Sequence, residues 1–169
     1  FPNFEVRKAL YRVVVPALTM KSNSEVVSAQ SFLRKMMQDG NTAEAKKALK
    51  ALIADVPYSN KKMASMDMEE RYRLIMSTIF RALGFRVEVE RMLATGRIDM
   101  IVEVPSFIYV LELKLSNNGG ISAAENQMKE KSYTEPFKAD KRKVIALAVE
   151  LDETGKGLID WKEVDEQEI

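Results

Sequence analysis

The chain of 169 residues is 46% hydrophobic and 30% charged, a profile typical of a globular protein with one core and room for a small appended module. Its 26 basic and 25 acidic residues leave a net charge of +1, so any nucleic-acid-binding basic surface must be local. It contains no cysteine and no histidine, which excludes disulfides, thiolate metal sites, histidine bases and nearly every catalytic zinc site. Chemistry would have to rest on carboxylates, lysine, tyrosine, hydroxyls and a hard divalent cation.

The sequence contains no apolar run close to the roughly 20 residues that a membrane span requires. Its start lacks the charged and then apolar segments of a secretory leader. We therefore expect a cytoplasmic protein with no membrane partner. Because the chain begins with Phe1 rather than methionine, we also expect it to be a fragment of a longer protein.

The first third of the chain, residues 1–55, has the pattern of a small helical bundle or packing segment and carries no chemistry. Helices are predicted around residues 10–18, 24–39 and 42–55 from their apolar spacing and capping residues. The segment Val56-Pro57-Tyr58-Ser59-Asn60 is typical of a break between elements. We place a domain boundary there, which divides the chain into an N-terminal helical segment, 1–55, and a second domain, 56–169.

The second domain opens with a strong helix, predicted from Asp67 to Leu83 and ended by Gly84. A stripe of large side chains recurs along it at helical spacing: Met68, Tyr72, Ile75, Ile79 and Leu83. This stripe predicts one buried face. Glu69 lies beside the stripe, so its carboxylate can face the edge of a sheet rather than open water.

Strand patterns follow this helix, and three of them are consecutive. They are predicted at residues 85–90, 97–104 and 107–115, with a turn at Pro105-Ser106 between the second and the third. A helix is then predicted at 122–131, a continuously apolar strand at 144–149 and a last strand at 158–161. This order predicts an α/β fold with a helix, a three-strand antiparallel meander, a helix and a strand, in a mixed sheet that has helices on its faces.

The second and third strands bring three charged residues together. If these strands pair through the Pro105-Ser106 turn, paired residue numbers add to about 211, and Asp99 lies opposite Glu112. Opposite side chains in an antiparallel pair are about 5 Å apart at Cβ, which is close enough to share one cation. Lys114 is two residues from Glu112 and points to the same face. Three charges among apolar neighbours are costly unless a ligand compensates, which favours a metal or substrate site.

In the functional interpretation, Asp99 and Glu112 bind one or two Mg²⁺ or Mn²⁺ ions, and water and a substrate phosphate complete the shell. The backbone carbonyl of Leu113 adds a ligand. Lys114 orients or activates the attacking water, or offsets charge in the transition state. Two further residues have supporting roles. Glu69 supplies an outer carboxylate to the metal, and Gln127 positions the substrate or a metal-bound water.

Each of these residues also has an ordinary structural interpretation when it is taken alone. Glu112 and Lys114 form an E-x-K pattern that is common as a salt bridge on a strand. Asp99 can cap a turn, and Glu69 is an ordinary carboxylate at the N-terminus of a helix. Gln127 suits a surface position or a hydrogen bond between helix and sheet. The functional interpretation therefore depends on the order and spacing of the whole set.

This order resembles that of the PD-(D/E)XK nuclease superfamily, in which a helix Glu precedes an Asp on the second strand, E-x-K on the third strand, and a helix. The motif reads Arg97-Ile98-Asp99 and Glu112-Leu113-Lys114, with Ile98 where the name-giving proline stands. The strings GRID, YVLELKL and AENQMKEKSY are similar to the nuclease-like domain at the C-terminus of bacterial AAA-ATPase-like proteins. The resemblance covers nearly the whole chain.

The resemblance implies a restriction-endonuclease-like core that hydrolyses nucleic acid with Mg²⁺ or Mn²⁺. DNA is the expected substrate, and RNA is the alternative. It also implies an ATPase-like domain before Phe1. It marks as site residues Glu69, Asp99, Glu112, Lys114 and Gln127, while Glu90 and Arg97 match recurrent positions of the group. Two alternatives stay open. One is a module of the same fold that binds nucleic acid or regulates without cleaving, and the other is a plain interaction domain that docks through residues 1–55.

Overall fold

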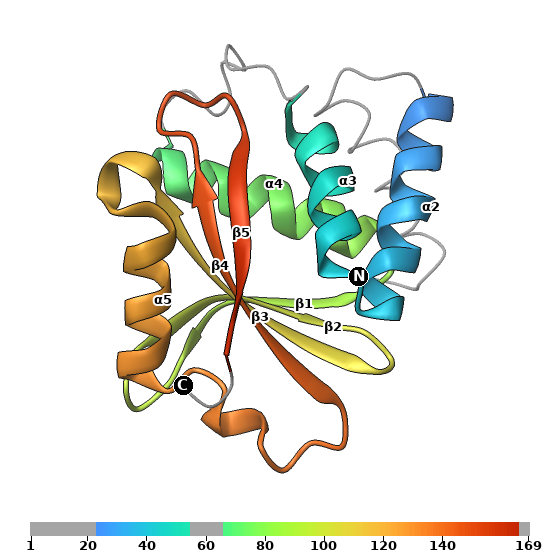
Figure 1. The fold of residues 1–169 in the computed structure, drawn as a ribbon. Helices are drawn as coiled ribbons and strands as arrows, with labels where there is room; N and C mark the ends of the chain where they lie inside the picture. The colour runs from blue at the N-terminus through green and yellow to red at the C-terminus, as the bar shows by residue number, and fades with distance from the viewer. Residues whose placement is uncertain (1–22, 55–65, 166–169) are drawn as a thin grey trace.

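The computed structural model describes residues 23–54 and 66–165 (Figure 1). The helix predicted around residues 10–18 and the break predicted at residues 56–60 lie outside the described residues. Within the described part of the chain, no helix is both long enough and apolar enough to cross a membrane.

The elements follow one another in the predicted order. The helices are α2 (Asn23–Asp39), α3 (Thr42–Ala54), α4 (Met68–Ala82) and α5 (Gly120–Lys131), with two 3₁₀ turns at Ser116–Asn118 and Glu135–Phe137. The strands are β1 (Arg86–Met92), β2 (Arg97–Glu103), β3 (Phe107–Leu115), β4 (Lys143–Leu151) and β5 (Leu158–Val164). The bounds of β3 are those predicted, and the bounds of the other elements differ from prediction by no more than three residues.

The described strands form one five-stranded sheet in the order β1-β2-β3-β4-β5. The first three are antiparallel neighbours, as the meander predicts. The chain then crosses over through α5, so β4 pairs parallel with β3, and β5 returns antiparallel to β4. The sheet is therefore mixed. The predicted core order ends with one strand after the second helix, and the last strand predicted at 158–161 is a longer strand, β5, of 7 residues at the edge of the sheet.

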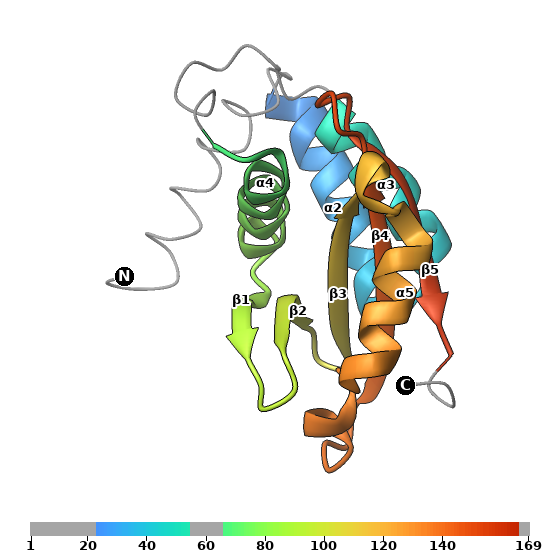
Figure 2. The same ribbon diagram turned by 90° about the vertical axis from the view of Figure 1, so that its left-hand side faces the viewer.

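Helices cover both faces of this sheet (Figure 2). The larger core lies between the sheet and α2, α3 and α4, and it includes Leu33, Leu49, Ile79, Leu111 and Leu147. The smaller core lies between α5 and the opposite face, around Ile101, Val110, Ala124, Met128 and Ala146. Successive buried residues of β3 belong alternately to the two cores, so this strand is covered on both sides.

The two N-terminal helices pack on the same core as the strands. The hydroxyl of Tyr109 in β3 donates to the carbonyl of Met37 at 2.6 Å, and the indole N–H of Trp161 in β5 donates to the carbonyl of Thr42 at 3.0 Å. Such bonds satisfy the polar ends of buried aromatic side chains. The division of the chain into 1–55 and 56–169 stays a prediction, but α2 and α3 share one core with the sheet.

Helix α4 begins where Asp67 caps it. One oxygen of the Asp67 carboxylate accepts hydrogen bonds from the backbone N–H of Glu69 at 3.1 Å and of Glu70 at 3.4 Å. The predicted buried stripe is confirmed, since Tyr72, Ile75 and Ile79 are all buried. The cap and the stripe together fix the rotation of α4, so Glu69 and Arg73, which lie one turn apart, face β2.

Candidate active site

The site lies where the ladder between β2 and β3 ends. Their paired residues run from Glu103 with Ile108 to Met100 with Leu111, and each pair adds to 211, so the predicted register is confirmed. The next residues along the two strands are Asp99 and Glu112. Both are buried, with Asp99 3% exposed and Glu112 0% exposed. The turn between the strands therefore brings two carboxylates to one buried place, as the sequence predicts.

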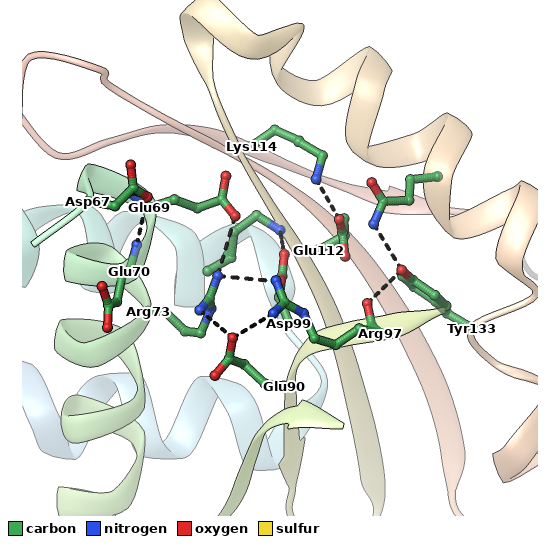
Figure 3. Close-up of polar contacts among 12 residues, drawn as sticks. Asp67, Glu69, Glu70, Arg73, Glu90, Arg97, Asp99, Glu112, Lys114 and Tyr133 are labelled. Carbon is green, nitrogen blue, oxygen red and sulfur yellow. Dashed lines mark hydrogen bonds and ion pairs between the residues drawn. The ribbon is translucent and has the colours of Figure 1, made fainter. Parts of the chain in front are cut away.

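Glu112 is a buried carboxylate with one oxygen paired. Its Oε1 accepts a hydrogen bond from the ammonium of Lys114 at 2.7 Å (Figure 3). Its Oε2 is buried and has no hydrogen-bond partner among the described residues. A buried polar atom without a partner is destabilising, and more so when it carries charge. A cation beside Oε2 would relieve this cost.

The protonation of the site follows from its burial. Burial raises the pKa of Glu112 to about 8, and the nearby Asp99 carboxylate adds to the rise. Burial works against the charged form of Lys114, but its hydrogen bond to Glu112 outweighs this effect and raises the pKa of Lys114. Lys114 is therefore an ammonium at neutral pH, able to donate hydrogen bonds and to offset negative charge. Burial and then the charge of Asp99 also raise the pKa of Glu69.

Asp99 is held from β3 and from α4. Its Oδ2 accepts a hydrogen bond from the backbone N–H of Leu113 at 2.9 Å, and its Oδ1 lies 3.6 Å from Nη2 of Arg73. Leu113 thus contributes its N–H to the site, and the metal-binding role of its carbonyl stays a prediction. These two contacts fix the orientation of the Asp99 carboxylate beside Glu112.

Arg73 is the central residue of this site that the sequence interpretation missed. Its guanidinium pairs with three carboxylates: Nη1 lies 3.0 Å from Glu90, and Nη2 lies 3.3 Å from Glu69 and 3.6 Å from Asp99. Arg97 donates to the same Glu90 oxygen at 2.8 Å. A signal existed, because Glu69 and Arg73 are four residues apart on one helix. We name as the acid–base cluster the residues Glu69, Arg73, Glu90, Arg97, Asp99, Glu112 and Lys114 (Figure 3).

An irregularity in β1 carries Glu90 into the acid–base cluster. The residues on either side keep the ladder with β2, Val89 with Met100 and Arg91 with Ile98. Glu90 itself has a φ of +55°, which is uncommon for a residue with a side chain, although the register of β1 against β2 is unbroken across it. The regular alternation of residues 85–90 predicts a plain strand, so the positive φ of Glu90 could not be foreseen.

Gln127 is connected to the site through Tyr133. Its side-chain N–H donates to the hydroxyl of Tyr133 at 2.9 Å, and that hydroxyl donates to the carbonyl of Arg97 at 2.6 Å. Tyr133 is fully buried and ties the end of α5 to the start of β2. The sequence interpretation gave Tyr133 no role. The expected role of Gln127, positioning substrate or a metal-bound water, stays a prediction.

Comparison with known proteins points to the same part of the chain. The profile of the PD-(D/E)XK nuclease superfamily matches residues 67–161, more than half of the chain, and this range contains the whole acid–base cluster. The chain belongs to the PD-(D/E)XK nuclease superfamily. Members of this superfamily are generally nucleases that use divalent metals such as Mg²⁺.

A relative from Azotobacter chroococcum mcd 1, called "Uncharacterized protein in vnfD 5'region", is 24% identical over 168 residues. The match covers 94% of this chain and 31% of the relative, so this chain spans about a third of the length of that protein. No solved structure matches the chain.

The acid–base cluster of this PD-(D/E)XK protein fits a small, hard, hydrated cation. Within residues 23–54 and 66–165, no group of three or more Asp, Glu, Cys or His side chains is placed to hold a metal. Asp99 and Glu112 are nevertheless neighbours, and Oε2 of Glu112 is buried and unpaired there. Mg²⁺ retains several waters and is commonly bound by one or two carboxylates, so this pair is a sufficient protein contribution.

Proposed function

We propose that this protein is a metal-dependent nuclease that hydrolyses the phosphodiester bonds of DNA with Mg²⁺ or Mn²⁺. The observation that carries the proposal is the buried Asp99–Glu112 pair, in which one Glu112 oxygen has no partner among the described residues and the other accepts a hydrogen bond from Lys114. In this buried place the charge of Asp99 opposes ionisation of Glu112, and a cation beside both carboxylates would remove that cost. Membership of a superfamily of nucleases supports the same conclusion.

The residues nearest the reacting phosphate have separate tasks. Asp99 and Glu112, with the carbonyl of Leu113, would hold the ion, and the Leu113 N–H keeps the Asp99 carboxylate oriented. A bound Mg²⁺ or Mn²⁺ supplies polarisation of the phosphate and a more acidic water. The Lys114 ammonium orients the attacking water and offsets the negative charge that develops on the phosphate oxygens.

Glu69 and Gln127 have supporting roles in the proposal. Glu69 is half-buried on α4, close enough to Asp99 for its pKa to respond to that charge, and it serves as an outer carboxylate. Gln127 lies on α5, where Tyr133 holds its amide, and it positions substrate or a bound water. The two roles draw on different elements, since Glu69 lies on α4 and Gln127 on α5.

The proposal is tested by incubating the chain with supercoiled plasmid, single-stranded DNA and RNA, in Mg²⁺, in Mn²⁺ and in a chelator. Lys114→Ala should abolish metal-dependent cleavage while the protein stays folded, because the charge beside Glu112 is lost. Lys47→Ala is the matched control, since Lys47 is 71% exposed on α3 in a surface ion pair. Lys47→Ala should cleave like the wild type, and metal-dependent cleavage that persists in a folded Lys114→Ala would contradict the assignment.

A catalytically inactive module that binds nucleic acid or regulates is the second candidate, and one observation favours it. Both oxygens of Asp99 are already engaged, one by the N–H of Leu113 and the other by the guanidinium of Arg73. This candidate predicts that the protein retards DNA in a gel without any turnover in either metal. Metal-dependent cleavage that needs Lys114 would exclude it.

We also propose that the chain acts as the C-terminal domain of a larger cytoplasmic protein with an ATPase-like domain. The support is the sequence resemblance described above, together with a relative of which this chain covers 31%. If the two domains work together, ATP should change the cleavage rate of the full-length protein. An unchanged rate with and without ATP would leave the nuclease proposal intact and contradict the coupling.

A further inference from the structure

The charges around Arg73 bear on how many metal ions the site accepts. Arg73 is 9% exposed, and its guanidinium lies among Glu69, Glu90 and Asp99 at 3.0 to 3.6 Å. A guanidinium keeps its charge at any working pH, and its planar shape suits several carboxylates at once. Arg73 therefore places a permanent positive charge between Asp99 and the two carboxylates of Glu69 and Glu90.

The balance of charge in the acid–base cluster leaves room for one divalent ion. Its described members are four carboxylates and three cationic groups, so it has one net negative charge when all are ionised. One divalent cation would make it singly positive, which complements the single negative charge of a phosphodiester. A second would leave three positive charges in a largely buried place, which is strongly unfavourable.

The ion pairs of Glu69 and Glu90 also indicate that the site binds one metal ion. A second ion in a two-metal site lies about 3.5–4 Å from the first and needs carboxylates of its own. The other carboxylates of the acid–base cluster are Glu69 and Glu90, and both already form ion pairs with the Arg73 guanidinium. Arg73 itself lies on α4, whose buried stripe packs in the larger core, and its guanidinium is held by these ion pairs.

We propose that this site binds a single divalent cation, at Asp99 and Glu112, and that Arg73 is the positioning residue that replaces a second metal ion. This inference rests on the proposed metal-dependent function and adds the stoichiometry of the site. Arg73 acts through Glu69, Glu90 and Asp99 by holding their carboxylates and supplying a fixed positive charge.

The test is a Mn²⁺ titration of the 169-residue chain. Calorimetry measures the number of ions bound, and electron paramagnetic resonance shows whether the bound ions are isolated or coupled. Glu112→Gln serves as the blank that removes the contribution of adventitious surface ions. The wild type should bind one Glu112-dependent Mn²⁺ with the spectrum of an isolated ion. Arg73→Met keeps the aliphatic stem and removes the charge, so it should bind two ions whose spins couple at about 4 Å.

Arg73→Lys keeps a positive charge and should restore a stoichiometry of one, which a merely structural role for Arg73 would not predict. Two coupled ions in the wild type would overturn the inference, as would a single ion of unchanged affinity in a folded Arg73→Met. Two ions in the wild type would overturn the inference even if Arg73→Met does not fold, and Arg73→Lys then tests the role of Arg73. Absence of any Glu112-dependent Mn²⁺ would overturn this inference and the metal dependence of the proposed function together, whereas cleavage with two bound ions would overturn this inference alone.

Discussion

At the scale of single residues, Glu112 is subject to two opposing effects: burial favours its protonated form, and a bound metal would favour its carboxylate. The side chain is fully buried, one oxygen is paired with Lys114 and the other has no partner among the described residues. In the absence of a metal, the folded protein favours the protonated acid, because burial and Asp99 both act against ionisation. A metal favours the carboxylate. The proposed binding of a metal at Glu112 would therefore be coupled to release of a proton from this residue.

The free energy of unfolding should show this coupling. The pKa of Glu112 is raised from 4.5 to about 8 on folding, so between these values the folded state binds more protons than the unfolded state. Stability contributed by this group is therefore full below pH 4.5 and is lost as the pH rises to about 8. The measurement is urea unfolding in a chelator at a series of pH values.

Glu112→Gln is the matched variant, because it keeps the size of the side chain and removes its titration. Its unfolding free energy should fall less with rising pH than that of the wild type. Mg²⁺ should stabilise the wild type more at pH 8 than at pH 5, since only the carboxylate binds it well. Parallel pH profiles for the two proteins would show that Glu112 has an ordinary pKa in the folded state.

At the scale of elements, the sequence predicted correctly the features that depend on neighbouring residues in the chain. The Pro105-Ser106 turn fixed the register of β2 against β3, and the apolar stripe fixed the buried face of α4. The positive φ of Glu90 and its ion pair with Arg73 involve residues of α4 and β1 that lie far apart in the chain, so no single stretch of sequence encodes them. The full length of β5 depends on its pairing with β4 for the same reason.

The start of α5 offers a prediction at this scale. Gly120 has a φ of +51°, and a Cβ there would lie 2.5 Å from the carboxyl group of Glu150, which accepts the N–H of Ile121. Gly120→Ala should therefore cost about 1–3 kcal/mol of unfolding free energy, from backbone strain and displacement of Glu150. Ser122→Ala, at an exposed position of the same helix, should change stability by roughly 0.5 kcal/mol or less. Equal effects in the two variants would contradict the close approach.

At the scale of the whole molecule, the N-terminal helices and the sheet behave as one packed unit. Side chains of α2 and α3 belong to the core that also contains the inner residues of β3 and β4. Tyr109 and Trp161 add hydrogen bonds from the strands to these helices. The strands β2 and β3 that carry the acid–base cluster therefore share their core with helices that contribute no residue to that cluster.

Leu49 tests this shared core. It is 0% exposed on α3, so Leu49→Ala should destabilise the protein by about 2–5 kcal/mol in a single unfolding transition seen by both near-UV and far-UV signals. Leu74→Ala, at a position 42% exposed on α4, is the control and should cost much less. Loss of α3 in a separate, earlier transition would instead favour the predicted division at residue 56 into two units.

The most direct test of the central claim, that Glu112 helps to hold a catalytic cation, is the initial rate of plasmid cleavage over a Mg²⁺ titration. Wild type and Glu112→Gln are compared with Glu88→Gln, the same substitution at a half-exposed residue of β1. The wild type and Glu88→Gln should cleave with matching Mg²⁺ dependence, and Glu112→Gln should lose about 10²-fold or more of the rate. Metal-dependent cleavage by Glu112→Gln at the wild-type rate would contradict the account.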